Sequence, residues 1–529
     1  MRPRLLHPDR EFDTHGRLPR QAATLVQDLE LSTLTAAMAR GDKRIADIAQ
    51  RALLAPLTDL DAIAYRQAVV RDCLAHPNDA RALYALAVAA IERAEQASWA
   101  FMPRKPASIV RHARDVLLAY LESLRALRRL ADRRGEHVAS DALRVFFELI
   151  RRELDDAALR EMERHLRALR FTAGIRVSAG LGPANKARDI VLHHGRARAR
   201  VWTRLERWWP PLRRRREPAF SYQLDPADEN GVRALDEVRD RILEGVSVTL
   251  AQASEQVAGF FHALRSEMAF YVGCLNLAER LGELGAATCL PEPVADAPGP
   301  WQAQGLYDPC LALSADQPPV DNDVAPQAAS LVIVTGANQG GKTTFLRSVG
   351  LAQLMLQAGM VVAARSLRAG ACAGIFTHFK REEDASMTSG KLDEELARMS
   401  AIVDELRPGS LLLLNESFAA TNEREGSEIA HQIVDAVTES GVRVYFVTHL
   451  DDFARRRYER DAAGTLFLRA ERRPDGERTF KLRPGAPERT SHGMDLYRAI
   501  FGDADDGVGD AEDEAAGPTA DAHPPHTPT

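Results

Sequence analysis

Residues 331–350 read LVIVTGANQGGKTTFLRSVG, and this stretch decides the fold of the second half of the chain. Its first five residues form an apolar run that is typical of a buried parallel strand. Residues 336–343 then fit the phosphate-loop pattern G-x-x-x-x-G-K-[ST], and Phe345, Leu346 and Val349 predict a helix after the loop. Because a strand and a helix are the context that the pattern requires, we predict a nucleotide-binding loop rather than an ordinary glycine-rich turn.

The residue types in this loop match the chemistry of phosphate binding. Glycines let the backbone turn so that its N–H groups face the phosphates, and the start of a helix adds partial positive charge. Lys342 supplies a point charge, and the Thr343 hydroxyl is a ligand for Mg²⁺. The predicted nucleotide-binding residues are Gly336, Ala337, Asn338, Gln339, Gly340, Gly341, Lys342, Thr343 and Thr344.

Two later segments carry groups suited to hydrolysis. Residues 410–414 and 442–447 are further candidates for buried strands. Asn415 and Glu416 follow the first, and a carboxylate beside a phosphate loop can orient or deprotonate the attacking water. His449 follows the second, where an imidazole can contact the γ-phosphate. Each residue alone is a common surface feature, but their order after the loop predicts catalytic roles for Glu416 and His449.

Helical spacing dominates the chain before residue 291. From about residue 28 to residue 170, apolar residues recur on faces that are most simply core. Two of these faces are Ile63, Val70 and Leu74, and Val110, Leu117, Leu121 and Leu124. A longer repeat predicts one long amphipathic helix, which is either packed in a bundle or used as a lever. It consists of Val257, Phe261, Leu264, Met268, Tyr271 and Leu275.

The pattern changes between residues 171 and 230. Ile175 and Val177, and the run at 191–194, predict short strands. Nine arginines with three tryptophans among them then fall between Arg196 and Arg216, a mixture that suits contact with phosphates and with base or sugar faces. The alternative is a solvated loop in an arginine-rich protein, and the sequence does not decide between the two. The candidate DNA contacts are Arg213, Arg214, Arg215 and Arg216.

Composition indicates a soluble globular protein of several domains, with 45% hydrophobic and 27% charged residues. The formal net charge of −6 is misleading, because residues 503–529 hold eight acids and no lysine or arginine, so that the rest of the chain carries +2. The five cysteines have no regular spacing, which argues against a disulfide framework or a zinc site. No signal peptide or membrane span is evident. We therefore expect a cytoplasmic protein.

Four segments around the phosphate loop resemble motifs of the MutS family of DNA repair ATPases, which belong to the ABC class. TGANQGGKTTFLR at 335–347 is similar to the family's loop TGPNMGGKST, and IFTHFKREEDASMTSG at 375–390 to its signature region. LLLLNESFAATNEREG at 411–426 is similar to its Walker B segment and D-loop, and FVTHL at 446–450 to its switch segment. The resemblance is specific over residues 300–502 and poor in motifs before them.

This resemblance implies an ATP site with Mg²⁺ that two copies of the chain complete together. Asn322, in the family's lead-in to the ATPase, is then a nucleotide-binding residue. The trans signature residues would be Thr388, Ser389 and Gly390, reaching the partner's ATP. Asn415 stands where the family carries an acid. An amide can accept hydrogen bonds from Mg²⁺-bound water but brings no charge, so we expect an outer-shell role and weaker binding of the ion.

The fold class implied is an α/β P-loop ATPase domain of the ABC class, similar to MutS domain V, preceded by a mostly α-helical core and lever domain with a small clamp-like insertion. The predicted parts are an N-terminal segment at 1–27, the helical domain at 28–290 with the insertion at about 171–230, the ATPase domain at 291–502, and an acidic, disordered tail at 503–529.

Two departures from the family limit what it implies. Because the helical pattern begins near the start of the sequence, we expect no mismatch-recognition or connector domain before it, and no direct reading of mismatches. We also expect no nuclease-like extension of the recombination-suppressing branch, since the segment after residue 502 is acidic. The triplet Phe146-Phe147-Glu148 contains the F-x-E of mismatch readers, but its helical context predicts an apolar pair beside a surface glutamate.

The hypothesis is therefore a homodimeric, DNA-dependent ATPase and damage sensor of the MutS type, which binds duplex or branched DNA in mismatch repair or recombination. One alternative is an ATP-dependent structural clamp with slow turnover and no mismatch recognition. Another is the motor subunit of a transporter, which the helical region and the MutS-like flanks disfavour.

Overall fold

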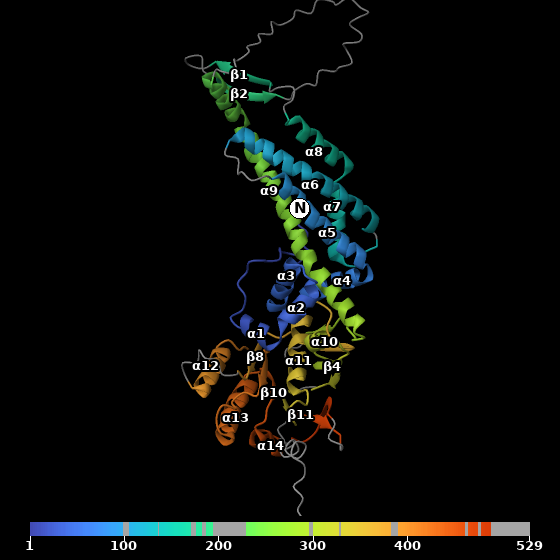
Figure 1. The fold of residues 1–529 in the computed structure, drawn as a ribbon, viewed down its shortest axis with the longest axis vertical. Coiled ribbons are helices and arrows are strands. Elements are labelled where there is room, and N and C mark those ends of the chain that lie inside the picture. The colour runs from blue at the N-terminus through green and yellow to red at the C-terminus, as the bar shows by residue number, and fades with distance from the viewer. Residues whose placement is uncertain are drawn as a thin grey trace, which may run out of the picture.

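The computed structural model describes residues 1–98, 105–135, 137–170, 176–181, 187–193, 229–295, 300–326, 329–381, 390–460, 464–473 and 478–487. A helical region stands end to end on an α/β region, which makes the molecule elongated (Figure 1). The arginine-rich run and the acidic tail of the sequence lie outside the described residues. Within them, no helix is both long and apolar enough to span a membrane.

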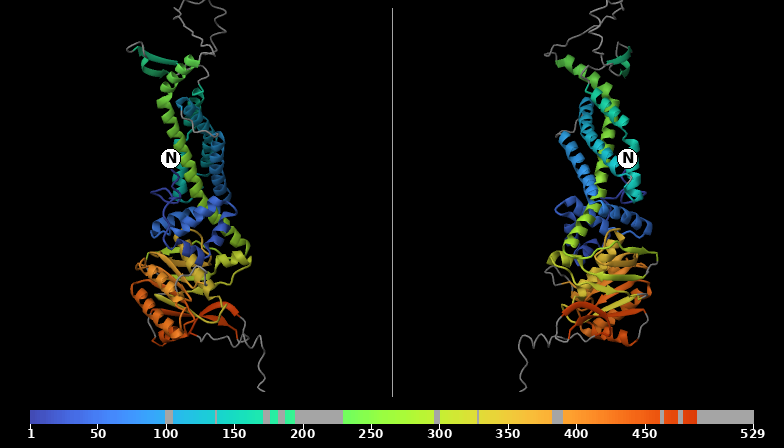
Figure 2. Two further views of the ribbon diagram at one scale, coloured as in Figure 1. Left: turned by 60° about the vertical axis from the view of Figure 1, so that its left-hand side comes forward. Right: turned by 90° about the vertical axis from the view of Figure 1, so that its right-hand side faces the viewer.

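The helical region is built along one helix, α9 (Glu229–Glu283), which has 55 residues and therefore a length of about 80 Å. Figure 2 shows α9, in green, running from the far end of the helical region to the α/β region. It packs against α2 to α6. The shorter helices are α1 (Ala22–Asp28), α2 (Leu31–Ala39), α3 (Lys43–Leu54), α4 (Leu60–Ala75), α5 (Pro77–Ala97), α6 (Pro106–Arg134), α7 (Asp141–Glu153) and α8 (Asp156–Ala168).

The apolar faces predicted from helical spacing are core, with one exception. All four residues of the α6 face are buried, and so are Ile63 and Val70 on α4. Leu74 was expected beside them but is 37% exposed in the last turn of α4, so the covered face does not continue to the end of this helix. Phe146 on α7 is 1% exposed and Glu148 pairs with Arg144 at the surface, as the helical context predicted.

Two strands, β1 (Arg176–Leu181) and β2 (Ala187–His193), form an antiparallel hairpin at the end of the molecule farthest from the α/β region (Figure 1). They correspond to the two short strands expected between residues 171 and 230. The role of this part as a DNA clamp stays a prediction.

The α/β region contains a six-stranded sheet in the order β12-β11-β6-β10-β9-β8, parallel except for the edge strand β12. Its strands are β6 (Leu331–Thr335), β8 (Ile375–Phe379), β9 (Leu411–Asn415), β10 (Arg443–Val447), β11 (Thr465–Arg472) and β12 (Arg478–Pro484). The three strands predicted from apolar runs are β6, β9 and β10, with bounds within one residue. Their runs are continuous rather than alternating because both faces of the sheet are covered.

A four-stranded sheet in the order β3-β7-β4-β5 lies beside it, and helices complete the region. These elements are β3 (Glu292–Val294), β4 (Trp301–Leu306), α10 (Pro309–Ala315), β5 (Asn322–Val324), α11 (Lys342–Gln357), β7 (Ser366–Gly370), α12 (Lys391–Val403), α13 (Glu423–Glu439) and α14 (Asp451–Glu459).

The two faces of the six-stranded sheet belong to different cores. Alternate residues such as Ile333 and Phe446 pack with α12, α13 and α14. The residues between them, such as Val334 and Tyr445, pack with α11 in a core that continues without a break through α9 and α1 to α7. The helical region and the phosphate-loop helix therefore share one hydrophobic core.

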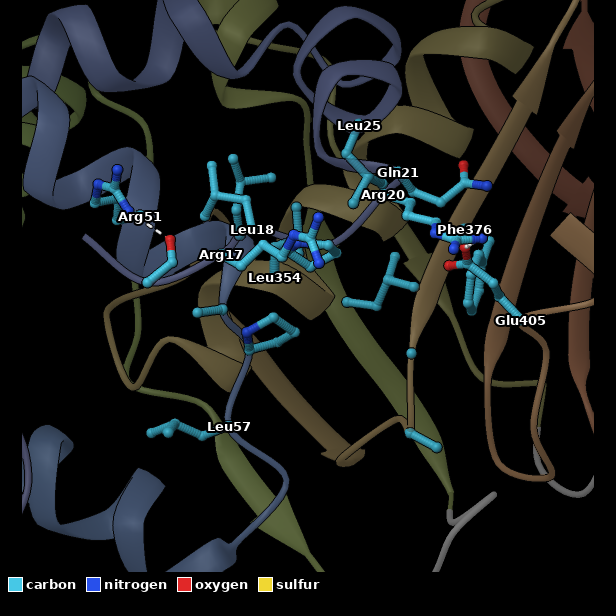
Figure 3. Close-up of a pocket in the computed structure, with 18 of the residues that line it drawn as sticks. Arg17, Leu18, Arg20, Gln21, Leu25, Arg51, Leu57, Leu354, Phe376 and Glu405 are labelled. Atoms are coloured by element: carbon cyan, nitrogen blue, oxygen red, sulfur yellow. Dashed lines mark hydrogen bonds and ion pairs between the residues drawn. The ribbon is translucent and has the colours of Figure 1, made fainter. Parts of the chain in front are cut away.

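The N-terminal segment also joins the two regions, and it borders a cavity of about 1160 Å³ at their junction (Figure 3). The Arg51 guanidinium on α3 donates to the carbonyl of Gly16 over 3.1 Å. Arg20 lies 3.7 Å from the Glu405 carboxylate, just after α12. Leu5 is fully buried, and its carbonyl accepts a hydrogen bond from Tyr271 on α9. The segment is thus a strap between the helical region and the sheet region.

Candidate active site

The predicted site residues converge because three parallel strands end side by side. β10 lies between β6 and β9, and its Val447 pairs with Val334 on one side and with Asn415 on the other. The loops that follow the three strands therefore start at the same edge of the sheet. In open α/β sheets this carboxyl edge is where ligands bind.

The loop after β6 has a backbone that only glycine accommodates easily. Gly336 and Gly341 have φ values of +118° and +86°. A Cβ at Gly336 would lie 3.0 Å from the backbone nitrogen of Ala470 on β11, and one at Gly340 would lie 2.8 Å from the Ala470 Cβ. The glycines of the sequence pattern are thus required both by conformation and by the close approach of β11.

Lys342 is held inside this loop at the start of α11. Its ammonium donates to the carbonyls of Gly336 and Ala337 over 2.7 and 2.8 Å. Burial lowers the pKa of Lys342 to about 8, and the carboxylate of Glu416 opposes part of that shift. A buried cation that no carboxylate of the described residues contacts directly is suited to receive an anionic ligand.

Thr343 and Asn415 face each other across the sheet edge. The Thr343 hydroxyl donates to the Asn415 side-chain oxygen over 3.0 Å. No cluster of three or more histidine, cysteine or acidic residues that could hold a metal is found in the described part of the chain. The Thr343 hydroxyl and the Asn415 oxygen are the protein oxygens that a Mg²⁺ ion could use here, and such an ion keeps several waters and binds substrate phosphates.

Glu416 follows β9 and lies beside two cationic or polar groups. Its carboxylate is 3.3 Å from Nε2 of His449 and 4.0 Å from the Lys380 ammonium. The adjacent His449 lowers the pKa of Glu416 most, burial opposes it, and Lys380 and Lys342 lower it further. Glu416 is therefore an ionised carboxylate near neutral pH, which is the state that a base or water-orienting group needs.

A cavity of about 380 Å³ opens between the phosphate loop and the segment before β5. Its wall contains all the predicted nucleotide residues from Asn338 to Thr344, together with Glu416 and Asn322. The Asn322 side chain is already engaged, since it accepts from the Leu482 N–H over 2.7 Å and donates to the Phe480 carbonyl over 3.4 Å. Asn322 therefore fixes the edge strand β12 against the cavity.

Other residues of the cavity wall were not predicted. The apolar side comes from the segment after β4 and from Phe480 on β12. The residues concerned include Tyr307, Leu311, Pro318, Pro319 and Val320. The motifs LYDP at 306–309 and VDND at 320–323 lie at the two ends of this segment. They are the sequence signal from which these wall residues could have been predicted.

Some predicted residues do not reach this cavity. Gly390 is the residue before α12, and the cavity wall formed by the described residues does not include it. Thr388 and Ser389 lie outside the described residues, and so do the arginines at 213–216. Their roles stay predictions.

Models of known protein families match two parts of the chain. Residues 58–284 match the MutS2 N-terminal domain, and residues 332–502 match MutS domain V. Among curated proteins, the DNA mismatch repair protein MutS of Natronomonas pharaonis is 27% identical over 314 residues, which are 59% of this chain and 34% of that protein.

Two further relatives show the same pattern. The endonuclease MutS2 of Leuconostoc citreum is 26% identical over 268 residues, 50% of this chain and 32% of its own length. The DNA mismatch repair protein MutS of Chloroflexus aurantiacus (strain J-10-fl) is 30% identical over 194 residues, 35% of this chain and 20% of its own length. The chain thus matches about a third or less of the length of each of these relatives.

Proposed function

The chain belongs to the MutS family, and on that premise we propose that it is a DNA-binding ATPase of mismatch repair or recombination. Two copies would pair so that the Gly390 end of each α12 reaches the ATP of the other. ATP binding and hydrolysis would then control the grip on DNA. The clamp would be the insertion at about 171–230, whose sequence contains the arginine-rich run.

The ionised Glu416 carboxylate beside the phosphate loop is the observation that carries this proposal. Lys342 would leave the two loop carbonyls and neutralise charge on the β and γ phosphates. Thr343 would hold Mg²⁺, with Asn415 in its outer shell, and the ion would offset the negative charge of the phosphates. Glu416 would orient the attacking water and accept its proton, and His449 would contact the γ-phosphate.

The shared core supports coupling between the ATP site and the helical region. α11 carries Lys342 at its first residue and contributes to the core that includes α9. Arg347 on the same helix pairs with Asp308 in the cavity wall and with Glu30 between α1 and α2. A shift of α11 on nucleotide binding would therefore displace helical residues directly.

ATP binding and steady-state turnover of two variants test the site. Lys342→Ala should weaken ATP binding by roughly tenfold or more, because the variant removes a charge-assisted hydrogen bond to the phosphates. Glu416→Gln should keep ATP bound and lower kcat by about 100- to 10,000-fold. Glu439→Gln, at an exposed position on α13, is the matched control and should turn over at the parental rate. Parental hydrolysis in both site variants would refute the assignment.

A slow structural clamp is the second candidate, and Asn415 favours it, because the amide brings no negative charge to the ion. Turnover with and without duplex and branched DNA separates the two functions. A DNA-dependent ATPase should accelerate on DNA, whereas a clamp should bind ATP and DNA together with hydrolysis unchanged.

The DNA contacts are tested by salt dependence. Replacing Arg213 to Arg216 with alanine should weaken DNA binding about equally for all sequences and flatten its dependence on log salt by roughly 0.9 for each phosphate that the variant no longer neutralises. Alanine at Arg455 and Arg456, which pair with Asp452 on α14, is the control. An unchanged slope in the first variant would show that the arginine-rich run does not contact DNA phosphates and is a solvated loop.

A further inference from the structure

The loop that carries Glu416 has an unusual backbone. Glu416 and Phe418 have φ values of +52° and +66°, and neither is a glycine. Left-handed conformations are uncommon for such residues and persist only where surrounding contacts impose them. The direction in which Glu416 points therefore depends on what holds residues 416–418.

One of these contacts comes from α12. The backbone N–H of Phe418 donates to Oε1 of Glu395 over 2.7 Å, and the Glu395 side chain is buried. Glu395 lies one turn into α12, which begins at Lys391 directly after Gly390. A single side chain thus connects the helix of the predicted signature segment with the backbone two residues beyond Glu416.

His378 at the end of β8 braces the same junction. Its Nδ1 is 2.7 Å from the Ser417 hydroxyl, and its Nε2 is 3.1 Å from the Glu395 carbonyl oxygen. Burial lowers the pKa of His378 to about 4, so the ring is neutral and one nitrogen donates. Nε2 donates to the carbonyl, so Nδ1 is the unprotonated nitrogen. The single hydrogen of the Ser417 hydroxyl is then shared between Nδ1 and the backbone carbonyl oxygen of His378, which lies 2.8 Å away. The imidazole fixes α12 and the loop relative to each other.

The segment directly after β8 is tied to the helical region. The Arg381 guanidinium lies 3.0 Å from the carboxylate of Asp28, which is buried at the end of α1. Arg398 on α12 donates to the Phe379 carbonyl over 3.2 Å. The end of β8 is therefore linked both to the helical region, through Arg381, and to α12, through Arg398.

We propose that Glu395 is a positioning residue for ATP hydrolysis, holding the backbone of residues 416–418 so that Glu416 points toward the phosphates. This inference rests on the proposed function. Glu395 takes no part in the chemistry itself, and its effect passes through the Phe418 N–H. Without this hydrogen bond, Glu416 should move away from the reacting atoms while the phosphate loop stays intact.

Three substitutions at Glu395 test separately whether the length of this side chain or its charge matters for turnover. Glu395→Ala removes the acceptor, and Glu395→Asp keeps the charge but is one methylene shorter. Both should lower kcat by roughly tenfold or more, because misplacing a catalytic group by about 1 Å costs up to about 100-fold. Glu395→Gln keeps an oxygen at the same reach and should restore most of the rate. KM and ATP affinity should stay within about twofold of the parental values, since the loop of Lys342 is untouched.

Glu394→Ala is the matched control, with the same residue type one position earlier on α12, and should behave as the parental protein. Circular dichroism melting of each variant monitors folding, and the contrast of Glu395→Gln with Glu395→Asp keeps the test valid if alanine unfolds the protein. Parental kcat in Glu395→Asp, or equal losses in Glu395→Asp and Glu395→Gln, would overturn the positioning role. If Glu416→Gln also hydrolyses ATP at the parental rate, the proposed function fails instead.

Discussion

The two loops of the site reach similar backbone conformations by different means. In the loop after β6, the two largest positive φ values belong to glycines, Gly336 and Gly341, and one non-glycine, Gln339, is left-handed at +60°. In the loop after β9, Glu416 and Phe418 are left-handed without being glycines. The first loop needs little from outside, whereas the second depends on Glu395, 23 residues before Phe418 in the sequence.

The difference matters for how each loop can be altered. A phosphate loop specified by its own glycines binds its ligand with a fixed geometry. A hydrolysis loop held by side chains of α12 and β8 changes when those elements move. Under the proposed function, binding would thereby be separated from turnover, and each of the following experiments tests one side of that separation.

The largest effect is expected from a change inside the phosphate loop. Gly336→Ala places a Cβ 3.0 Å from the Ala470 backbone nitrogen at a φ of +118°. Because such backbone strain costs about 1–3 kcal/mol, ATP affinity should fall by roughly tenfold to 100-fold. Equilibrium binding of a fluorescent ATP analogue measures it.

Gly245→Ala on α9 is the control for this experiment, since nothing lies within 4 Å of its added Cβ. It should leave binding unchanged and stabilise the helix by about 0.5–1 kcal/mol. Parental ATP affinity in Gly336→Ala would show that the loop does not depend on its glycine.

A smaller effect is expected from His449→Ala, because His449 lies next to Glu416, which is in the loop after β9. His449 is the main cause of the lowered pKa of Glu416, so its removal raises that pKa toward the ordinary value. The inactive, protonated Glu416 then appears at higher pH, and the acid limb of the kcat profile should move upward. Lys380→Ala should move it in the same direction by less, because Lys380 is the weaker influence. A larger shift in Lys380→Ala would contradict this order.

The contrast between the loops also explains what sequence reasoning could find. The strands β6, β9 and β10, the long helix α9 and the phosphate loop were predictable, since each is encoded in a contiguous run or a regular period. Leu74 was wrongly predicted to be buried, because helical periodicity identifies one face of a helix but not which residues of that face other elements cover. The hydrogen bonds of Glu395 with Phe418 and of Asn322 with Leu482 have no local pattern, and only the folded chain brings these residues together.

Asn415→Asp should test the second loop further, by changing the Mg²⁺ requirement about tenfold. A carboxylate would stand 3.0 Å from the Thr343 hydroxyl and add negative charge near the ion. Changes in groups around a metal typically alter its affinity by about 10-fold or more, so half-maximal turnover should need less Mg²⁺. Asn415→Ala is the control and should need more. Identical Mg²⁺ titrations for the Asn415→Asp variant and the parental protein would rule this role out.

The smallest expected effect concerns the proton on Lys342. Burial holds its pKa at about 8 in the free loop, and the phosphates of a bound nucleotide must raise it, because they favour the charged form. Nucleotide binding near pH 8 should therefore take up about half a proton, and affinity should fall about twofold between pH 7 and pH 8. Calorimetry of ATP-analogue binding in two buffers with different ionisation enthalpies measures the uptake. At pH 6, where Lys342 is already charged in the free protein, this lysine should contribute no uptake. Equal apparent enthalpies in the two buffers at pH 8.5 would show that no proton is taken up and that Lys342 is fully charged before the nucleotide binds. Proton uptake would then make no contribution to the affinity for the nucleotide.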